Sequence, residues 1–403
     1  MRRIFVLGAL LYSATLYASP WVFDQPLPVT ALSAQNVFTH LESAGRKNIA
    51  LSAGWVALVW EDNRDGVPRC YVALKGPAQA AFGKALQISG KEEAAEPAIV
   101  GMEGGRFAMA WEEAGHILVR SVQSTTLGAV TELGKTQAGQ ASLGFATGSG
   151  LYVVWSEAGK QFRKIKLAQL KLGKAGLLHI TASASVDSSA KGDQAYPSIA
   201  VLAAKKVVVG WEDRRSGHTR IFSALSLDNG LTFLPASGLN EFKWRGKDFN
   251  YGSGTGAMRV ALSASGPDGA VAVWADKRDF QSGYDVYAAL ASGMPLKFAA
   301  NEKVQDEFGN NIAQWHPAVA ANARGLIAAV WDDDRDGTPD VWLSWRNADG
   351  WADNLALPGA AGPGVQSDPS IALDEAGNLY VAWVEKADLN APSSIRYVMG
   401  HAQ

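Results

Sequence analysis

The sequence predicts an all-β fold, namely a seven-bladed β-propeller of four-stranded antiparallel blades. Three observations predict it: a tryptophan-centred motif that recurs along the chain, apolar residues that alternate with a period of two, and glycine-rich turns between the apolar runs. No convincing helical pattern interrupts them. We therefore expect one repeat domain over residues 19–403.

The repeat motif is a short apolar run that ends in Trp and is followed by acidic residues, often with Arg and Gly. By subtraction, its seven copies lie between 44 and 63 residues apart, which is the period of a four-stranded blade with loops of variable length. The predicted blades are centred near Trp60, Trp111, Trp155, Trp211, Trp274, Trp331 and Trp383.

The two ends of the repeat region predict how the ring closes. The last copy offers three strands before the chain stops, whereas an unassigned extended segment, residues 21–33, precedes the first copy. Because a half-blade would expose an unpaired edge, we expect this segment to form the outer strand of the last blade.

Residues 1–18 have the pattern of a secretory signal peptide. Arg2 and Arg3 precede an apolar run that ends at Tyr17, and small residues follow it. The run is too short to span a bilayer comfortably, so we expect an exported, periplasmic or extracellular protein without a membrane span. The lone Cys70 excludes an internal disulfide framework, and the formal net charge of −2 argues against a nucleic-acid partner.

One hairpin carries a complete motif of the form S-x-D-x-G-x-T-F. An Asp can accept hydrogen bonds from the backbone N–H groups of such a turn, and Gly can take the positive φ. The fixed positions are Ser226, Asp228, Gly230, Thr232 and Phe233.

This motif resembles the Asp box of the sialidase superfamily, also called the BNR repeat. The resemblance implies a propeller whose Asp box braces a turn on the face opposite the ligand site. The sialidase catalytic set of three arginines, a Tyr–Glu pair and an Asp cannot be assigned to residues of this sequence. The motif that bears the first arginine is absent, and Arg46 could only be a displaced relative of it.

An Asp-x-Arg pair follows the Trp in four of the seven blades. A ring of arginines could hold carboxylate or sulfate groups of an acidic glycan through paired hydrogen bonds. The alternative is that each Arg binds its own Asp and fixes the turn, which repetition from blade to blade favours. The ligand-binding candidates of this kind are Arg64, Arg215, Arg278 and Arg335.

Asp332, Asp334 and Asp336 precede Gly337 in the pattern D-x-D-x-D-G, which opens many calcium loops. The blade motif with one extra Asp gives the same sequence pattern. We therefore expect no cofactor, with calcium as the open alternative.

Two long connections hold the remaining candidates, because aromatic rings beside charged groups can form a sugar platform. The longer connection, residues 238–258, is either one wall of a pocket or a mobile insert. The ligand-binding candidates are Lys243, Trp244, Arg245, Asp248, Tyr251 and, in the connection 301–316, Trp315; the catalytic candidates are His316, Tyr251 and Glu241.

Among these, His316 could act as a general base. It also lies directly before Pro317, where other blades carry Glu96, Tyr196 and Asp368, so a variable capping position explains it equally well.

The sequence favours a monomeric binding module that recognises a glycan or a protein on the face of the inter-blade loops, without chemistry. The alternative is a carbohydrate-active enzyme, either a sialidase-type glycosidase or a lyase for uronic-acid polymers. A close carboxylate pair beside arginines at the central mouth would favour hydrolysis, whereas a His–Tyr pair with Arg would favour elimination.

Overall fold

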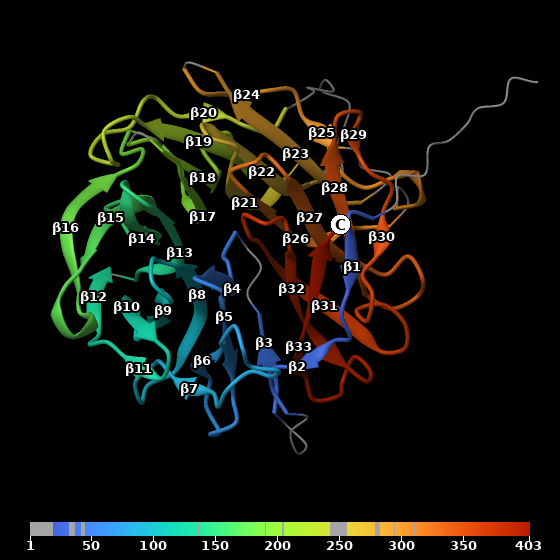
Figure 1. Cartoon of the computed structure of the whole chain (residues 1–403). Coiled ribbons are helices and arrows are strands. Elements are labelled where there is room, and N and C mark those ends of the chain that lie inside the picture. The colour runs from blue at the N-terminus through green and yellow to red at the C-terminus, as the bar shows by residue number, and fades with distance from the viewer. Residues whose placement is uncertain are drawn as a thin grey trace, which may run out of the picture.

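Seven antiparallel sheets surround one axis in the computed structural model, which confirms the predicted propeller (Figure 1). The structure describes residues 19–403 apart from residues 32–36, 42–44, 135–136, 190, 204, 242–255, 279–282, 294 and 310–311. Within those residues the helical structure consists of two short 3-10 turns, η1 (Lys174–Gly176) and η2 (Glu307–Gly309). No helix there has the length and apolar character needed to cross a membrane.

Each blade places its strands from the axis outward in chain order. The innermost strands are β4 (Ile49–Ser52), β8 (Ala94–Gly101), β13 (Gly139–Ala146), β17 (Gln194–Val201), β21 (Ala257–Ser265), β26 (Trp315–Ala321) and β31 (Val365–Leu373). The second strands, which carry the motif tryptophans, are β5 (Trp55–Asp62), β9 (Arg106–Glu113), β14 (Gly150–Glu157), β18 (Val207–Asp213), β22 (Gly269–Asp276), β27 (Ile327–Asp333) and β32 (Leu379–Lys386). A short strand β3 (Thr39–His40) also pairs with β5.

The third strands and the rim complete the blades. The third strands are β6 (Arg69–Lys75), β10 (His116–Gln123), β15 (Lys164–Leu172), β19 (Arg220–Ser226), β23 (Asp285–Ser292), β28 (Asp340–Asn347) and β33 (Ser394–Ala402). The outer strands are β7 (Leu86–Gln87), β11 (Thr126–Leu127), β12 (Thr131–Gly134), β16 (Leu178–Ser185), β20 (Ser237–Gly238), β24 (Lys297–Phe298), β25 (Glu302–Lys303), β29 (Gly350–Trp351) and β30 (Leu355–Ala356), with β1 (Trp21–Phe23) and β2 (Leu27–Pro28) on the last blade.

The hydrophobic core lies between neighbouring blades, because the facing side chains of two adjacent sheets pack against each other. One cluster, for example, joins Val59 and Val72 of blade 1 to Ile99 and Trp111 of blade 2. Six of the seven motif tryptophans are fully buried. Removing such rings from water supplies much of the stability in a fold that contains no disulfide.

The buried indoles need hydrogen-bond acceptors, and the motif supplies them two residues later. In six blades the Trp Nε1–H donates to the carboxylate at this position, over 2.8 to 3.0 Å. An unpaired buried donor would cost free energy. In these six blades the acidic residue at the end of the Trp strand therefore belongs to the packing of its blade.

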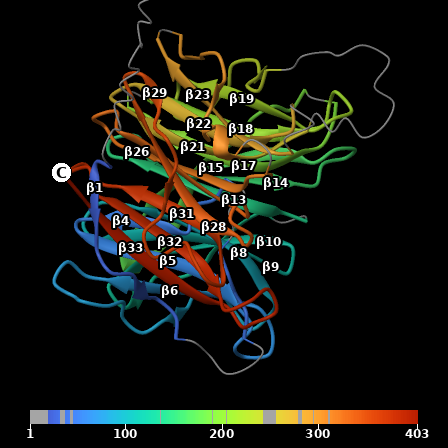
Figure 2. The same ribbon diagram turned by 90° about the vertical axis from the view of Figure 1, so that its right-hand side faces the viewer.

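The ring closes through the N-terminal segment, as the sequence predicts. β1 pairs with β33, with Trp21 opposite Ala402, and β2 pairs with the same strand through Leu27 and Tyr397. The Trp21 ring is buried against Trp345 with centroids 5.8 Å apart, and its Nε1–H donates to the carbonyl of Gly377. Both views place β1 beside β33 (Figures 1 and 2).

We expect Trp21→Ala to lower the free energy of unfolding by about 3 to 5 kcal/mol, because it opens a cavity at the closing strand. The measurement is chemical denaturation of the protein. Val22→Ala on the same strand is the matched control, since the Val22 side chain is 58% exposed. Equal stability of the two variants would contradict closure through this segment.

Candidate functional site

The inner strands of blades 2 to 7 share a β-bulge near their beginning. At each bulge the pairing with the Trp strand shifts, and one non-glycine residue has a positive φ between 48° and 65°. In four blades the next residue is Pro, which has no N–H to give to the ladder. The inner strands of these four blades begin before the Pro. The positive-φ residues are Glu96, Gln140, Tyr196, Arg259, His316 and Asp368.

Blade 1 places Arg46 at the equivalent position. The Val59 N–H donates to the Asn48 carbonyl, which sets the register of this strand. The preceding Gly45 has a φ of +76°, and its carbonyl accepts a hydrogen bond from Ser142 of blade 3. A Cβ on Gly45 would lie only 2.2 Å from the Val260 carbonyl oxygen of blade 5. Glycine therefore lets the chain of blade 1 approach three other blades at the axis.

We call these seven residues, Arg46 and the six bulge residues, the axial ring. The six bulge side chains are partly exposed, whereas the Arg46 side chain is buried. Residues held at positive φ concentrate at functional sites, so the ring is the candidate site of this propeller.

Hydrogen bonds between blades fix the ring. In four cases the carboxylate directly after a motif Trp accepts the backbone N–H of the next blade's bulge residue; we call this N–H the bulge N–H. The Glu212 carboxylate, for instance, accepts the Arg259 N–H at 2.8 Å. The other three pairs are Glu61 with Glu96, Glu112 with Gln140, and Asp332 with Asp368.

Glu96 and Glu112 form a close carboxyl pair beside Arg46. The Arg46 guanidinium donates to Glu96, and the two carboxyl groups share a hydrogen bond. Burial and the neighbouring Glu96 raise the pKa of Glu112 to about 8. Burial opposes ionisation of Glu96, but its hydrogen bond to Glu112 and the Arg46 charge outweigh burial and lower its pKa. Glu112 therefore carries the proton at neutral pH.

His316 lies between two carboxylates on the opposite part of the ring. Its Nδ1 is 2.7 Å from Asp332 and its Nε2 is 3.5 Å from Asp368. Burial would lower the pKa of His316, but these two charges outweigh it and raise the pKa to about 9. The imidazole is therefore a cation at neutral pH.

An aromatic pair lies beside the axial ring, between blades 5 and 6. The rings of Tyr284 and Trp315 have centroids 5.1 Å apart, and Trp315 is 36% exposed. Burial and the charge of the nearby Glu212 carboxyl group raise the pKa of Tyr284, and burial raises the pKa of Glu212 itself to about 6. The region thus combines stacking surface with an ionisable carboxyl group.

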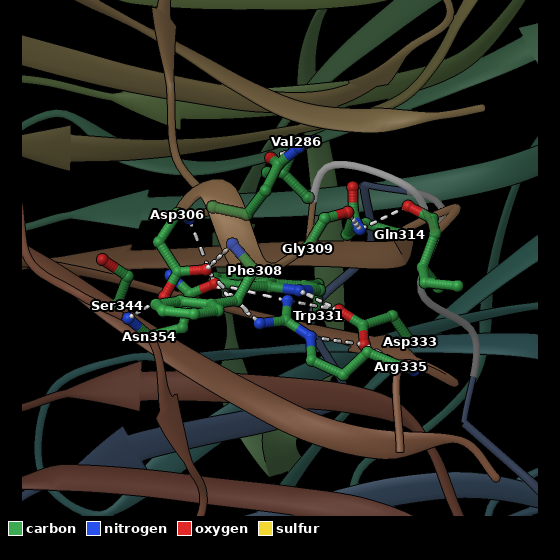
Figure 3. A network of polar contacts seen from close by, with 12 residues as sticks. Val286, Asp306, Phe308, Gly309, Gln314, Trp331, Asp333, Arg335, Ser344 and Asn354 are labelled. Atoms are coloured by element: carbon green, nitrogen blue, oxygen red, sulfur yellow. Dashed lines mark hydrogen bonds and ion pairs between the residues drawn. The ribbon is translucent and has the colours of Figure 1, made fainter. Parts of the chain in front are cut away.

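The four Asp-x-Arg pairs form repeated modules inside their blades. Each Arg donates to the Asp two residues before it and lies 3.9 to 4.2 Å from an aromatic ring of the third strand. Arg335 lies between Asp333 on one side and Asp306 and Asn354 on the other (Figure 3). These contacts account for Arg64, Arg215, Arg278 and Arg335 without a ligand.

The Asp box braces the β19–β20 hairpin, which lies at the ends of the strands away from the axial ring. Asp228 accepts hydrogen bonds from both the N–H and the hydroxyl of Thr232, and Ser226 accepts the Gly230 N–H. The hydrogen bonds that Thr232 donates, together with one from the Ser226 hydroxyl, lower the pKa of Asp228 to about 2. Phe233 packs against the core cluster between blades 3 and 4.

The three aspartates of the D-x-D-x-D-G pattern do not act as one group. Asp332 faces His316, and the intervening Asp333 binds Arg335. Across the described part of the chain, no three His, Cys, Asp or Glu side chains are grouped to hold a metal.

The insert candidates Lys243, Trp244, Arg245, Asp248 and Tyr251 lie outside the described residues. Glu241, at its beginning, exchanges hydrogen bonds with Asn301 of the next connection. The structure places His316 and Trp315 in or beside the axial ring, but Glu241 is tied to this loop contact.

Sequence reasoning missed Glu96, Glu112, Glu212, Arg259 and Asp368 as members of one site. Two signals could have found them: the variable residue before the inner-strand Pro, and the residue directly after each Trp. Both positions vary between blades while their surroundings repeat.

Comparisons with known proteins support the fold. No protein-family model matches the chain, and no curated protein matches it in sequence. A Dyadobacter fermentans protein of unknown function is similar over 96% of this chain and 100% of its own, with a TM-score of 0.55 and 11% identity. An ulvan lyase of polysaccharide lyase family PL25 is similar over 93% and 95%, with a TM-score of 0.53 and 9% identity.

A Penicillium chrysogenum α-L-arabinanase also aligns, over 72% of this chain and 89% of its own, with a TM-score of 0.46 and 13% identity.

We expect Arg335→Ala to lower the free energy of unfolding by about 3 kcal/mol, because it leaves the buried Asp333 without its cation. Urea denaturation measures this loss. Arg324→Ala on an exposed turn is the control and should leave stability unchanged. A similar small effect for both would show that the module does not stabilise its blade.

Stability should fall as pH rises through the alkaline range. Because the folded pKa of His316, about 9, exceeds its ordinary value of 6.5, its contribution is complete below pH 6.5 and is lost as pH rises through 9. The melting temperatures of the wild type and His316→Asn between these pH values test this. The variant should show a shallower decline; an identical decline would exclude a charged His316.

Proposed function

We propose that this protein is a carbohydrate-active enzyme that hydrolyses an acidic glycan at the axial ring. The observation that carries the proposal is the close pair of Glu96 and Glu112 beside Arg46, with the proton on Glu112 at neutral pH. A pure scaffold has no need for such a pair, because burying carboxyl groups costs stability. Strongly shifted pKa values are typical of catalytic groups.

The chemistry assigns one role to each of two carboxyl groups. Glu112 donates its proton to the glycosidic oxygen as the bond to the anomeric carbon breaks. Water then adds to the anomeric carbon and gives a proton to a second, ionised carboxylate. We assign Glu212 to this second role, since its pKa of about 6 leaves it mostly ionised at neutral pH.

The cations of the ring support an acidic substrate. Arg46, Arg259 and the charged His316 come from blades 1, 5 and 6, so they surround the axis. Guanidinium groups bind carboxylates and sulfates through directed hydrogen bonds. Trp315 supplies an exposed ring for a sugar face.

Hydrolysis is favoured over elimination by the state of His316. An elimination from a uronic acid would need an unprotonated base, whereas the two flanking carboxylates keep this imidazole charged. The complete Asp box supports a place among sialidase-like propellers. The ulvan lyase that shares the fold supports a carbohydrate ligand, though at 9% identity it cannot decide the reaction.

The test is hydrolysis of a panel of acidic oligosaccharides, read as reducing ends released. Glu112→Gln should reduce kcat by about 100-fold or more while the melting temperature stays near that of the wild type, because the amide cannot act as an acid. Wild-type activity should fall as pH rises through about 8.

Glu132→Gln is the matched control, since Glu132 lies on the outer strand of the same blade, bound to His116. Full activity of Glu112→Gln, or release of unsaturated sugar products by the wild type, would overturn the proposal of hydrolysis.

A further inference from the structure

Three blade junctions lack the hydrogen bond that holds the other four, and one of the three lies beside Tyr284 and Trp315. At the junctions from blade 1 to 2, 2 to 3, 4 to 5 and 6 to 7, the carboxylate after the motif Trp accepts the bulge N–H. From blade 5 to 6 the residue after Trp274 is Ala275, whose methyl group cannot accept a hydrogen bond. The His316 bulge N–H therefore has no carboxylate from the preceding blade.

The other two junctions without this carboxylate are closed in different ways. From blade 3 to 4, Ser156 is too short, and Gln140 replaces it by accepting the Tyr196 N–H at 2.8 Å. From blade 7 to 1, Val384 packs in an apolar cluster with Leu41 and Leu58. At the junction of blades 5 and 6, the missing acceptor instead lies beside polar and aromatic side chains.

Those neighbours favour a ligand that carries an anionic group on a ring that can stack. The His316 imidazolium belongs to the same residue as the unmatched N–H, and Arg259 is close enough to affect the charge of His316. Asp332 and Asp368 hold this imidazolium in place. Trp315 is the residue directly before the bulge, and its ring is partly exposed against Tyr284.

We propose that the junction of blades 5 and 6 is a subsite for the carboxylate of an acidic sugar, which takes the place of the carboxylate that the repeat supplies at four other junctions. The ligand oxygen accepts the His316 N–H, as Glu212 accepts the Arg259 N–H one blade earlier. The sugar ring then lies against Trp315. This subsite rests on the proposed function for its place in a catalytic site. The chemical class of its occupant, a carboxylate, follows from the carboxylates that fill the same position at four other junctions.

Restoring the missing carboxylate tests the subsite. Ala275→Glu places the repeat's own carboxylate where we expect the ligand's, and it should block the subsite without loss of stability. The probe is sodium glucuronate, with glucose and sodium chloride as controls for the ring and for ionic strength. Binding is measured by calorimetry and by the rise in melting temperature, which grows with ligand concentration over Kd.

The wild type should bind glucuronate more tightly than glucose, and Ala275→Glu should weaken glucuronate binding by about tenfold or more. Ala275→Ser, whose hydroxyl is too short to reach, is the matched control and should bind as the wild type does. Trp315→Ala should weaken glucuronate and glucose alike. If Ala275→Glu does not fold, Ala275→Gln offers a neutral acceptor of the same length and should weaken binding in the same way.

Unchanged glucuronate binding in Ala275→Glu or Ala275→Gln would overturn the subsite. Glu112→Gln separates the two proposals, since it should lose turnover and keep glucuronate binding. An intact probe-binding site without any hydrolytic activity in the wild type would reject the proposed hydrolysis and leave the subsite standing. Hydrolysis that Ala275→Glu does not impair would reject the subsite alone.

Discussion

The hydrogen bond from a buried indole N–H to a carboxylate two residues later organises this propeller. The Trp ring must be buried because it fills the space between two blades, and its N–H then needs an acceptor that water cannot supply. An Asp or Glu at the end of the same strand meets that need in six blades. In four of them the Asp also orients an Arg over an aromatic ring of the next strand.

A second constraint acts at the axis. Seven inner strands approach one another there, and each pairs with its own Trp strand through a bulge or an equivalent irregular segment. The bulge frees one side chain and one N–H from the ladder. Where the carboxylate after the Trp accepts that N–H, the contact joins two blades; at the junction of blades 3 and 4, Gln140 accepts it instead. The N–H at this position therefore joins neighbouring blades over most of the ring.

The axial ring and the Asp-x-Arg modules differ in how their charged groups are balanced. The charges of Arg335 and Asp333 neutralise each other through paired hydrogen bonds. Glu112, in contrast, shares its hydrogen bond with Glu96 from the inner strand, and burial keeps it protonated. Propellers of little sequence similarity can differ in what they do, so the chemistry has to be argued from such groups.

The sequence by itself determined the blade count, the tryptophan register, the closing N-terminal strand and the all-β class. Each of these depends on local periodicity and on residues within one repeat, which a linear pattern records directly. It also indicated that each Arg of the Asp-x-Arg pairs could bind its neighbour, because two residues of spacing keep the partners adjacent. The sequence also offered His316 as a possible general base and Trp315 as a sugar platform, but it did not place them beside the other residues of the axial ring.

Only the tertiary structure decided which residues meet at the axis. Arg46, Glu112 and His316 lie far apart in the chain, and their approach depends on the sevenfold arrangement of the blades and on the positive φ at each bulge. The same holds for Asp332, which reads as part of a calcium loop in sequence but faces His316 because alternate strand residues point to opposite faces. A site assembled from one residue per repeat leaves no local pattern, since its members share a position in the fold and not a neighbourhood in the chain.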